Sequence, residues 1–129
     1  MPIINYNPNF RAAQYEGTSA DTTLTSGTAT KGAWVQLIAS TSFYWNWINL
    51  TLHDANTNND YYTDIGIGAA GSEVVLIPDI NYHSYAVGTG VTTLKDVFKC
   101  QIPIGTRISA RTKATANTDT LDLNVIGTG

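Results

Sequence analysis

The side chains best suited to acid–base chemistry or to metal binding are scattered along the sequence. The two histidines, His53 and His83, are thirty positions apart, and neither has the spacing of a metal-ligand motif. Asp54, Asp60 and Asp64 follow His53 closely, and Ca²⁺ favours clustered carboxylates. This stretch nevertheless lacks the alternating aspartates, central glycine and closing glutamate of an EF-hand, and aspartates that cap their own turns explain it equally well. We therefore predict no bound metal and no cofactor.

Candidates for nucleophilic catalysis are equally sparse. The sequence contains no G-x-S-x-G motif, and its only glutamates are Glu16 and Glu73. The single cysteine, Cys100, alternates with Phe98 and Ile102, which predicts a position on the inward face of a strand. A buried thiol is usually a small apolar side chain of low reactivity. We predict no catalytic residues and a protein that is not an enzyme.

Composition and charge disfavour two classes of partner. Seven basic and ten acidic residues give the 129-residue chain a net charge of −3. Arg107, Arg111 and Lys113 form a modest basic edge, which is too little charge to follow a phosphate backbone. We interpret that edge as a solvated or inter-subunit strand face, and we expect no nucleic-acid partner. No apolar run reaches membrane-spanning length, and the first residues do not resemble a secretory signal, so we expect no membrane partner.

Short alternating segments separated by turn residues dominate the chain after residue 32. A period of two predicts half-buried strands, and their regular spacing favours an antiparallel β-sandwich or barrel. About eight strands favour a jelly roll over a seven-stranded immunoglobulin plan. We therefore predict an all-β protein, an antiparallel β-sandwich of the jelly-roll type. The expected strands cover residues 33–39, 45–52, 61–68, 73–78, 81–87, 98–102, 106–112 and 121–125.

The first two dozen residues differ from the rest. Pro2 and Pro8 favour extended backbone, and a turn-rich stretch follows at residues 17–23. We predict an extended N-terminal arm over residues 1–24 and a sandwich domain over residues 25–129; a frayed terminus is the alternative. The arm carries apolar side chains that could dock on the sandwich or on a neighbouring subunit. These interface candidates are Ile3, Ile4, Tyr6, Phe10 and Tyr15.

Aromatic residues gather at a few positions. In the segment 45–52, strict alternation places Trp45 and Trp47 opposite the aliphatic residues, and Tyr61 and Tyr62 follow in the next strand. Exposed aromatic rings beside asparagine are typical both of sugar-binding surfaces and of protein interfaces. These four residues are our candidates for an exposed aromatic surface. The alternative is that the tryptophans are buried.

Three segments, residues 32–43, 64–73 and 102–111, resemble a module of virion structural proteins in tailed bacteriophages. The second segment reads DIGIGAAGSE, the third reads IPIGTRISAR, and the similarity extends from about Thr25 to Gly127. Modules of this kind occur as jelly rolls in capsid decoration (cement) proteins and in fibre or tail appendages. The resemblance implies a non-enzymatic role, a homotrimer, and an arm that reaches a neighbouring subunit.

The expected function is therefore capsid decoration. The chain is short and lacks the long upstream shaft of a fibre subunit, which favours a cement protein. We expect it to be made in the host cytoplasm and to bind the major capsid protein on the outer surface of the phage head. The alternative is a glycan- or receptor-binding module of a tail or fibre that uses the aromatic candidates as a stacking platform.

Overall fold

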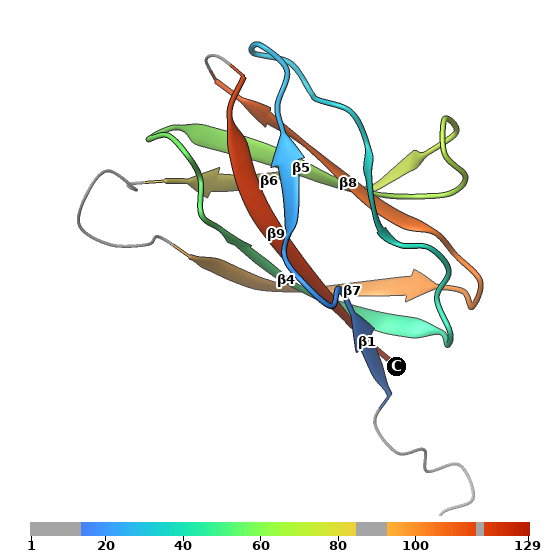
Figure 1. The fold of residues 1–129 in the computed structure, drawn as a ribbon. Coiled ribbons are helices and arrows are strands. Elements are labelled where there is room, and N and C mark those ends of the chain that lie inside the picture. Colours follow the sequence, from blue (N-terminus) through green and yellow to red (C-terminus); the bar gives the residue numbers. More distant parts are fainter. Residues whose placement is uncertain (1–13, 85–92, 116–117) are drawn as a thin grey trace, which may run out of the picture.

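The computed structural model describes residues 14–84, 93–115 and 118–129. Within these ranges the chain forms nine strands and no helix, and hence no helix that could cross a membrane. Two antiparallel sheets pack against each other as a sandwich (Figure 1), which confirms the predicted all-β class. The strands are β1 (Tyr15–Gly17), β2 (Thr22–Thr25), β3 (Val35–Ile38), β4 (Trp45–His53), β5 (Asp60–Ile67), β6 (Val74–His83), β7 (Leu94–Ile102), β8 (Ile108–Ala114) and β9 (Thr120–Thr128).

The first sheet, which we call sheet A, has β9 and β4 at its centre. β7 pairs with the free side of β4, while β1 and β2 both pair with the other side of β9 at different heights. The chain's C-terminus consequently lies beside β1 (Figure 1). The first and last described segments are thus joined in one sheet.

The second sheet, sheet B, has the order β3-β8-β5-β6. Its two central strands, β8 and β5, pair along seven consecutive positions from Tyr61–Ala114 to Ile67–Ile108. From β2 onward the chain changes sheet at every connection except the one between β5 and β6, and β1 and β2 both belong to sheet A. Most sheet neighbours are therefore distant in sequence.

The core lies between the sheets and follows the predicted alternation. In β4, Ile48, Leu50 and Leu52 point inward, and they pair laterally with inward residues of β9 such as Leu123 and Val125. β-branched and leucine side chains on a two-residue period bury one face of each strand and leave the other free. The largest fully buried side chains are Trp45, Tyr61, Leu24, Ile48, Leu50, Leu52, Ile65, Ile102, Ile108, Leu121, Leu123 and Val125.

Sheet A begins earlier in the chain than predicted. β1 and the first three residues of β2 lie within the range assigned to the N-terminal arm, and Leu24 of β2 is fully buried in the core. The alternation in Thr22–Thr25 is only four residues long and contains three threonines, so its single apolar residue gave little signal. Residues 1–13, which include Ile3, Ile4, Tyr6 and Phe10, lie outside the described residues.

We expected a strand to end at Pro78, but this residue lies inside β6. β6 is an edge strand, where a missing backbone donor breaks no ladder on the open side. The register with β5 shifts between the pairs Thr63–Ile80 and Ile65–Ile77, and Asp79 has a φ of 48°. A bulge at this point absorbs the proline, so most of the predicted segment 73–78 and the start of the predicted segment 81–87 form one strand, which ends at His83. Residues 85–87 lie outside the described residues.

Candidate functional site: the outer faces of the two sheets

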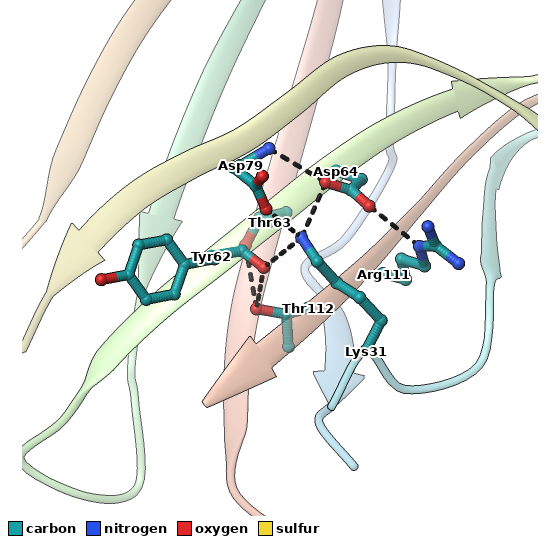
Figure 2. A network of polar contacts seen from close by, with 7 residues as sticks. All are labelled: Lys31, Tyr62, Thr63, Asp64, Asp79, Arg111 and Thr112. Atoms are coloured by element: carbon teal, nitrogen blue, oxygen red, sulfur yellow. Dashed lines mark hydrogen bonds and ion pairs between the residues drawn. The ribbon is translucent and has the colours of Figure 1, made fainter. Parts of the chain in front are cut away.

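The outer face of sheet B is built around the carboxylate of Asp64 (Figure 2). Asp64 lies in the middle of β5, and its side chain is only 4 % exposed. Its Oδ1 lies 2.7 Å from Nζ of Lys31 and accepts the backbone N–H of Asp79 at 2.9 Å. Its Oδ2 accepts from Nε of Arg111 at 2.9 Å. Lys31 Nζ also donates to the Tyr62 carbonyl oxygen and to Oδ1 of Asp79, so one ammonium group joins the β2–β3 connection to β5 and β6.

The charge state of this cluster follows from its contacts. Burial alone would raise the pKa of Asp64, but the Asp79 amide, Lys31 and Arg111 outweigh it and hold the pKa below its ordinary value. The carboxylate is therefore ionised at neutral pH and its acceptor positions are occupied. A group in this state is neither a proton donor nor a free ligand, so the cluster acts as a clasp that holds the β2–β3 connection on sheet B.

Trp34 covers the remaining part of this face. The Arg111 guanidinium carbon lies 4.4 Å from the centre of the Trp34 ring, a cation–π contact. The same ring lies over Gly66, where an added Cβ would come within 2.6 Å of it. Gly66 is therefore required by the close approach of the indole rather than by a turn.

The basic edge inferred from sequence is largely neutralised within the protein. Arg107 Nη1 lies 2.9 Å from a carboxylate oxygen of Glu73, whose side chain is 5 % exposed. Arg111 pairs with Asp64, and Lys113 lies over the Tyr62 ring at 5.9 Å. Two of the three cations are thus committed to ion pairs within their own subunit, which leaves little basic charge for a partner.

The outer face of sheet A is different. Tyr15, Trp47, Val97 and Ile126, which we call the sheet A patch, lie on this face and remain 75 %, 43 %, 54 % and 44 % exposed. The strand pairing places them in two adjacent rows: Tyr15–Thr128–Trp47 across β1, β9 and β4, and Gly17–Ile126–Asn49–Val97 across the whole sheet. Residues directly opposite one another in a ladder share a face, so the four side chains lie on one face, on diagonal positions with Thr128 and Asn49 between them.

Polar groups surround the sheet A patch in an uneven way. Lys95 and Lys99 lie on β7 in line with Val97, both are exposed, and no ion pair joins either one to another described residue. At the opposite edge, Asp21 lies 3.2 Å from Nε2 of His53 and accepts a hydrogen bond from Asn124, and Asp122 accepts one from Thr23. One lateral edge of this face is therefore basic, and the other is acidic.

Glu16 fixes the position of β1 and with it Tyr15. Its carboxylate accepts hydrogen bonds from the amide and hydroxyl of Ser42, at 2.8 and 2.7 Å, and from the Trp45 indole N–H at 2.7 Å. Burial alone would raise the pKa of Glu16, but the bonds from Ser42 and Trp45 outweigh it and keep the pKa below its ordinary value. The same contacts satisfy the one polar atom of the buried Trp45 side chain.

Two of the four aromatic candidates were wrongly predicted to be exposed. Trp45 is fully buried, because the register between β4 and β7 shifts between the pairs Trp45–Ile102 and Trp47–Lys99 and turns Trp45 into the core. Tyr61 is also fully buried, where its ring contacts Tyr82 and its hydroxyl is hydrogen-bonded near Thr57.

The other two aromatic candidates lie on different sheets. Tyr62 lies half-buried on sheet B, because neighbouring residues of a strand point to opposite faces, and Trp47 is exposed on sheet A. The predicted platform of four aromatic rings therefore does not form. Tyr15, an interface candidate from sequence, instead shares a face with Trp47.

The structure separates the histidines and aspartates that were considered for a cation. His53 lies between Asp21 and Asp54, at 3.2 Å from each, and His83 Nδ1 lies 2.5 Å from Asp60. Asp64 belongs to the clasp on sheet B. Among the described residues, no group of three or more His, Cys, Asp or Glu side chains is arranged to hold a metal ion.

Cys100 is buried, which confirms its predicted inward position. Its thiol contacts the carbonyl oxygen of Trp45 at 3.6 Å, and burial raises the pKa of the thiol. A thiol that stays protonated is a poor nucleophile, so Cys100 serves as a core side chain.

No protein-family model matches the sequence, and no curated protein matches it.

Proposed function

We propose that this protein is a structural component of a tailed-phage particle, a capsid decoration protein that binds the outer surface of the head. The observation that carries the proposal is the sheet A patch, in which four apolar side chains stay exposed on a rigid two-layer scaffold. Contiguous exposed apolar areas are typical of protein interaction sites. The resemblance to phage virion modules supplies the identity of the partner, the major capsid protein.

The strand order supports the jelly-roll form of the proposal. Sheet A contains β2-β9-β4-β7 and sheet B contains β3-β8-β5-β6, and the chain changes sheet at nearly every connection. Eight strands that fold from two Greek keys into two sheets show this pattern. β1 adds a short ninth strand at the edge of sheet A, next to the proposed contact surface.

The charge pattern is consistent with a binding protein whose chemistry lies in its contacts. The clasp and the Arg107–Glu73 pair use charges to hold the chain together, and the sheet A patch is flanked by a small number of charged residues. Few charges at a contact keep the desolvation cost low. A particle-bound protein present in many copies gains avidity from repeated modest contacts.

The test is the amount of this chain in purified phage particles and its binding to heads that lack it. We expect a ratio to the major capsid protein that corresponds to hundreds of copies per particle, as expected for a lattice-wide protein. We also expect Trp47→Ser to lower occupancy on undecorated heads at least tenfold, while Val74→Ser, which removes an exposed apolar side chain from β6, leaves it unchanged. A handful of copies per particle would contradict a decoration role.

The second candidate is a glycan-binding module of a tail or fibre. Trp47 and Tyr15 favour it, because they lie in one row of an open sheet, about 10 Å apart across two strand spacings, and stacked aromatic rings can hold a sugar. Binding on a glycan array that disappears in Trp47→Ala would support this function over capsid decoration.

A further inference from the structure

We infer that the outer face of sheet A is a self-complementary surface and that its occupant is a second copy of this chain. The inference rests on the proposed function: in the free protein a second copy covers the sheet A patch, and this copy dissociates when the same patch binds the head. It is supported by three properties of that face: its apolar middle, its opposite charges at the two edges, and its size.

The arrangement of charges indicates how two copies would meet. Lys95 and Lys99 lie on β7, at one lateral edge of sheet A, whereas Asp21 lies beside β2 at the other edge and Asp122 lies on β9 next to β2. In a two-fold contact, each residue pair occurs twice, because the same face is used by both subunits. A two-fold axis that lies between the faces and runs along β9 and β4 brings β7 of each subunit over the β1/β2 edge of its partner.

This orientation pairs opposite charges and covers the apolar groups. Lys95 lies in the row of Asn124, to which Asp21 is hydrogen-bonded, so it faces the partner's Asp21. Lys99 lies in the row of Tyr15 and faces the aromatic ring of the partner's Tyr15. Trp47 and Ile126 lie next to the axis, where Trp47 faces the partner's Thr128 and Ile126 faces the partner's Asn49. A two-fold axis across the strands would instead place the β7 lysines of one copy over those of the other.

The size of the face is adequate for a reversible dimer. Four strand columns about 4.8 Å apart and nine residues at about 3.3 Å per residue give a flat area on the order of 500 Å². The surface of the protruding side chains adds to this area. A standard stable interface buries about 800 Å² per partner. We therefore expect an association that depends on protein concentration. Sheet-on-sheet contact at a small angle is the normal way in which such faces pack.

The test is a charge exchange followed by sedimentation equilibrium at low and high salt. We expect Lys95→Glu and Asp21→Lys each to weaken self-association at least tenfold, and the double variant to recover at least half of the loss on a logarithmic scale. Trp47→Ser should abolish dimers at any concentration reached. Val74→Ser is the matched control on sheet B, and it should leave the association constant unchanged.

A monomer at millimolar concentration, or a dimer equally weakened by Val74→Ser, would overturn the inference. So would a double variant that is weaker than either single variant, because the two charges would then not face each other. Circular dichroism of every variant confirms that the sandwich is intact. Head binding is measured separately: a monomeric protein that still decorates heads refutes the dimer alone, and a dimer absent from particles refutes capsid decoration alone.

Discussion

Sheet B covers the middle of its outer face with its own chain, whereas the outer face of sheet A keeps four apolar side chains exposed. On sheet B, Lys31 and Trp34 from the connection before β3 lie across β8 and β5, where they meet Asp64, Arg111 and the surface of Gly66. On sheet A, Trp47 occupies a similar central position, but no segment of the described chain covers it. The difference indicates that one face stabilises the monomer and that the other is available to a partner.

The same comparison explains where the charges are used. The ion pairs of Asp64 with Lys31 and Arg111, and of Glu73 with Arg107, connect residues that are distant in sequence. On the outer face of sheet A, His53 lies 3.2 Å from Asp21, but no ion pair joins Lys95 or Lys99 to another described residue. Replacing Asp64 or Glu73 should therefore affect folding, and replacing Lys95 or Lys99 should affect association.

The largest effect is expected from Asp64→Ala. The substitution leaves Lys31 and Arg111 next to each other without the carboxylate, and removing one partner of a buried pair is strongly destabilising. Both cations keep some solvent contact, so we expect a loss of about 3 kcal/mol in the free energy of unfolding, measured by urea denaturation.

Asp79→Asn is the matched control for the clasp. Asp79 bonds the same Lys31 ammonium, but its side chain is 65 % exposed, and asparagine tolerates its positive φ. We expect a loss below about 1 kcal/mol. Equal losses of unfolding free energy for Asp64→Ala and Asp79→Asn would show that the burial of Asp64 adds nothing to the stability of the clasp.

A smaller loss is expected from Gly66→Ala. The added methyl group would overlap the Trp34 ring, and overpacking of this kind costs about 2 kcal/mol when the neighbour cannot move freely. Trp34→Ala removes the obstacle, so the same glycine substitution should cost much less in that background. If the losses of stability from Gly66→Ala and Trp34→Ala simply add in the double variant, the Trp34 ring does not restrict residue 66. Trp34 then packs less tightly on sheet B than the structure indicates.

A smaller, acid-dependent loss of stability is expected at the edge of sheet A. Glu16 has a lowered pKa in the folded state, so its contribution to stability is complete above the ordinary glutamate pKa and declines as the pH falls through the folded value. Glu16→Gln cannot titrate at this position. Its unfolding free energy should therefore fall less than that of the wild type between about pH 5 and pH 3.

Asp64 titrates in the same direction, because its pKa is also lowered. It therefore contributes to the acid dependence of both proteins, and only the difference between wild type and Glu16→Gln reports on β1. Indole fluorescence should follow the change, since Trp45 donates to Glu16. Parallel acid curves for the two proteins would contradict a stabilising role for the ionised carboxylate.

The sequence was sufficient to predict the class of the fold, because each strand carries its own period of two. The alternating Ile48, Leu50 and Leu52 of β4, and Leu121, Leu123 and Val125 of β9, are buried as that period requires. The position of Trp45 was not predictable, because a register shift between β4 and β7 turns its side chain inward. The sequence of β4 alone does not show that shift. A bulge depends on how two strands pair, so the sequence of one strand does not predict it.

The clasp on sheet B was unpredictable for a related reason. Lys31, Asp64 and Arg111 are separated by more than thirty residues from one another, and only the pairing of β5 with β8 and the path before β3 bring them together. The sequence showed an aspartate near turn residues and an arginine on a strand. The sheet A patch is similar: Tyr15, Trp47, Val97 and Ile126 come from four strands whose order the sequence does not state.

The smallest effect on stability is expected from Val97→Thr and Ile126→Thr on the outer face of sheet A. Both side chains are about half exposed, threonine suits a strand, and surface substitutions of this kind usually stay within about 0.5 kcal/mol. Denaturation must be measured at low protein concentration, so that association does not add to the apparent stability. Ile48→Thr on the inward side of β4 is the contrasting variant, because it places a hydroxyl in the core. A loss above about 1.5 kcal/mol for either outward substitution would mean that the folded monomer already covers this face, and the contrast between the two sheets would then disappear.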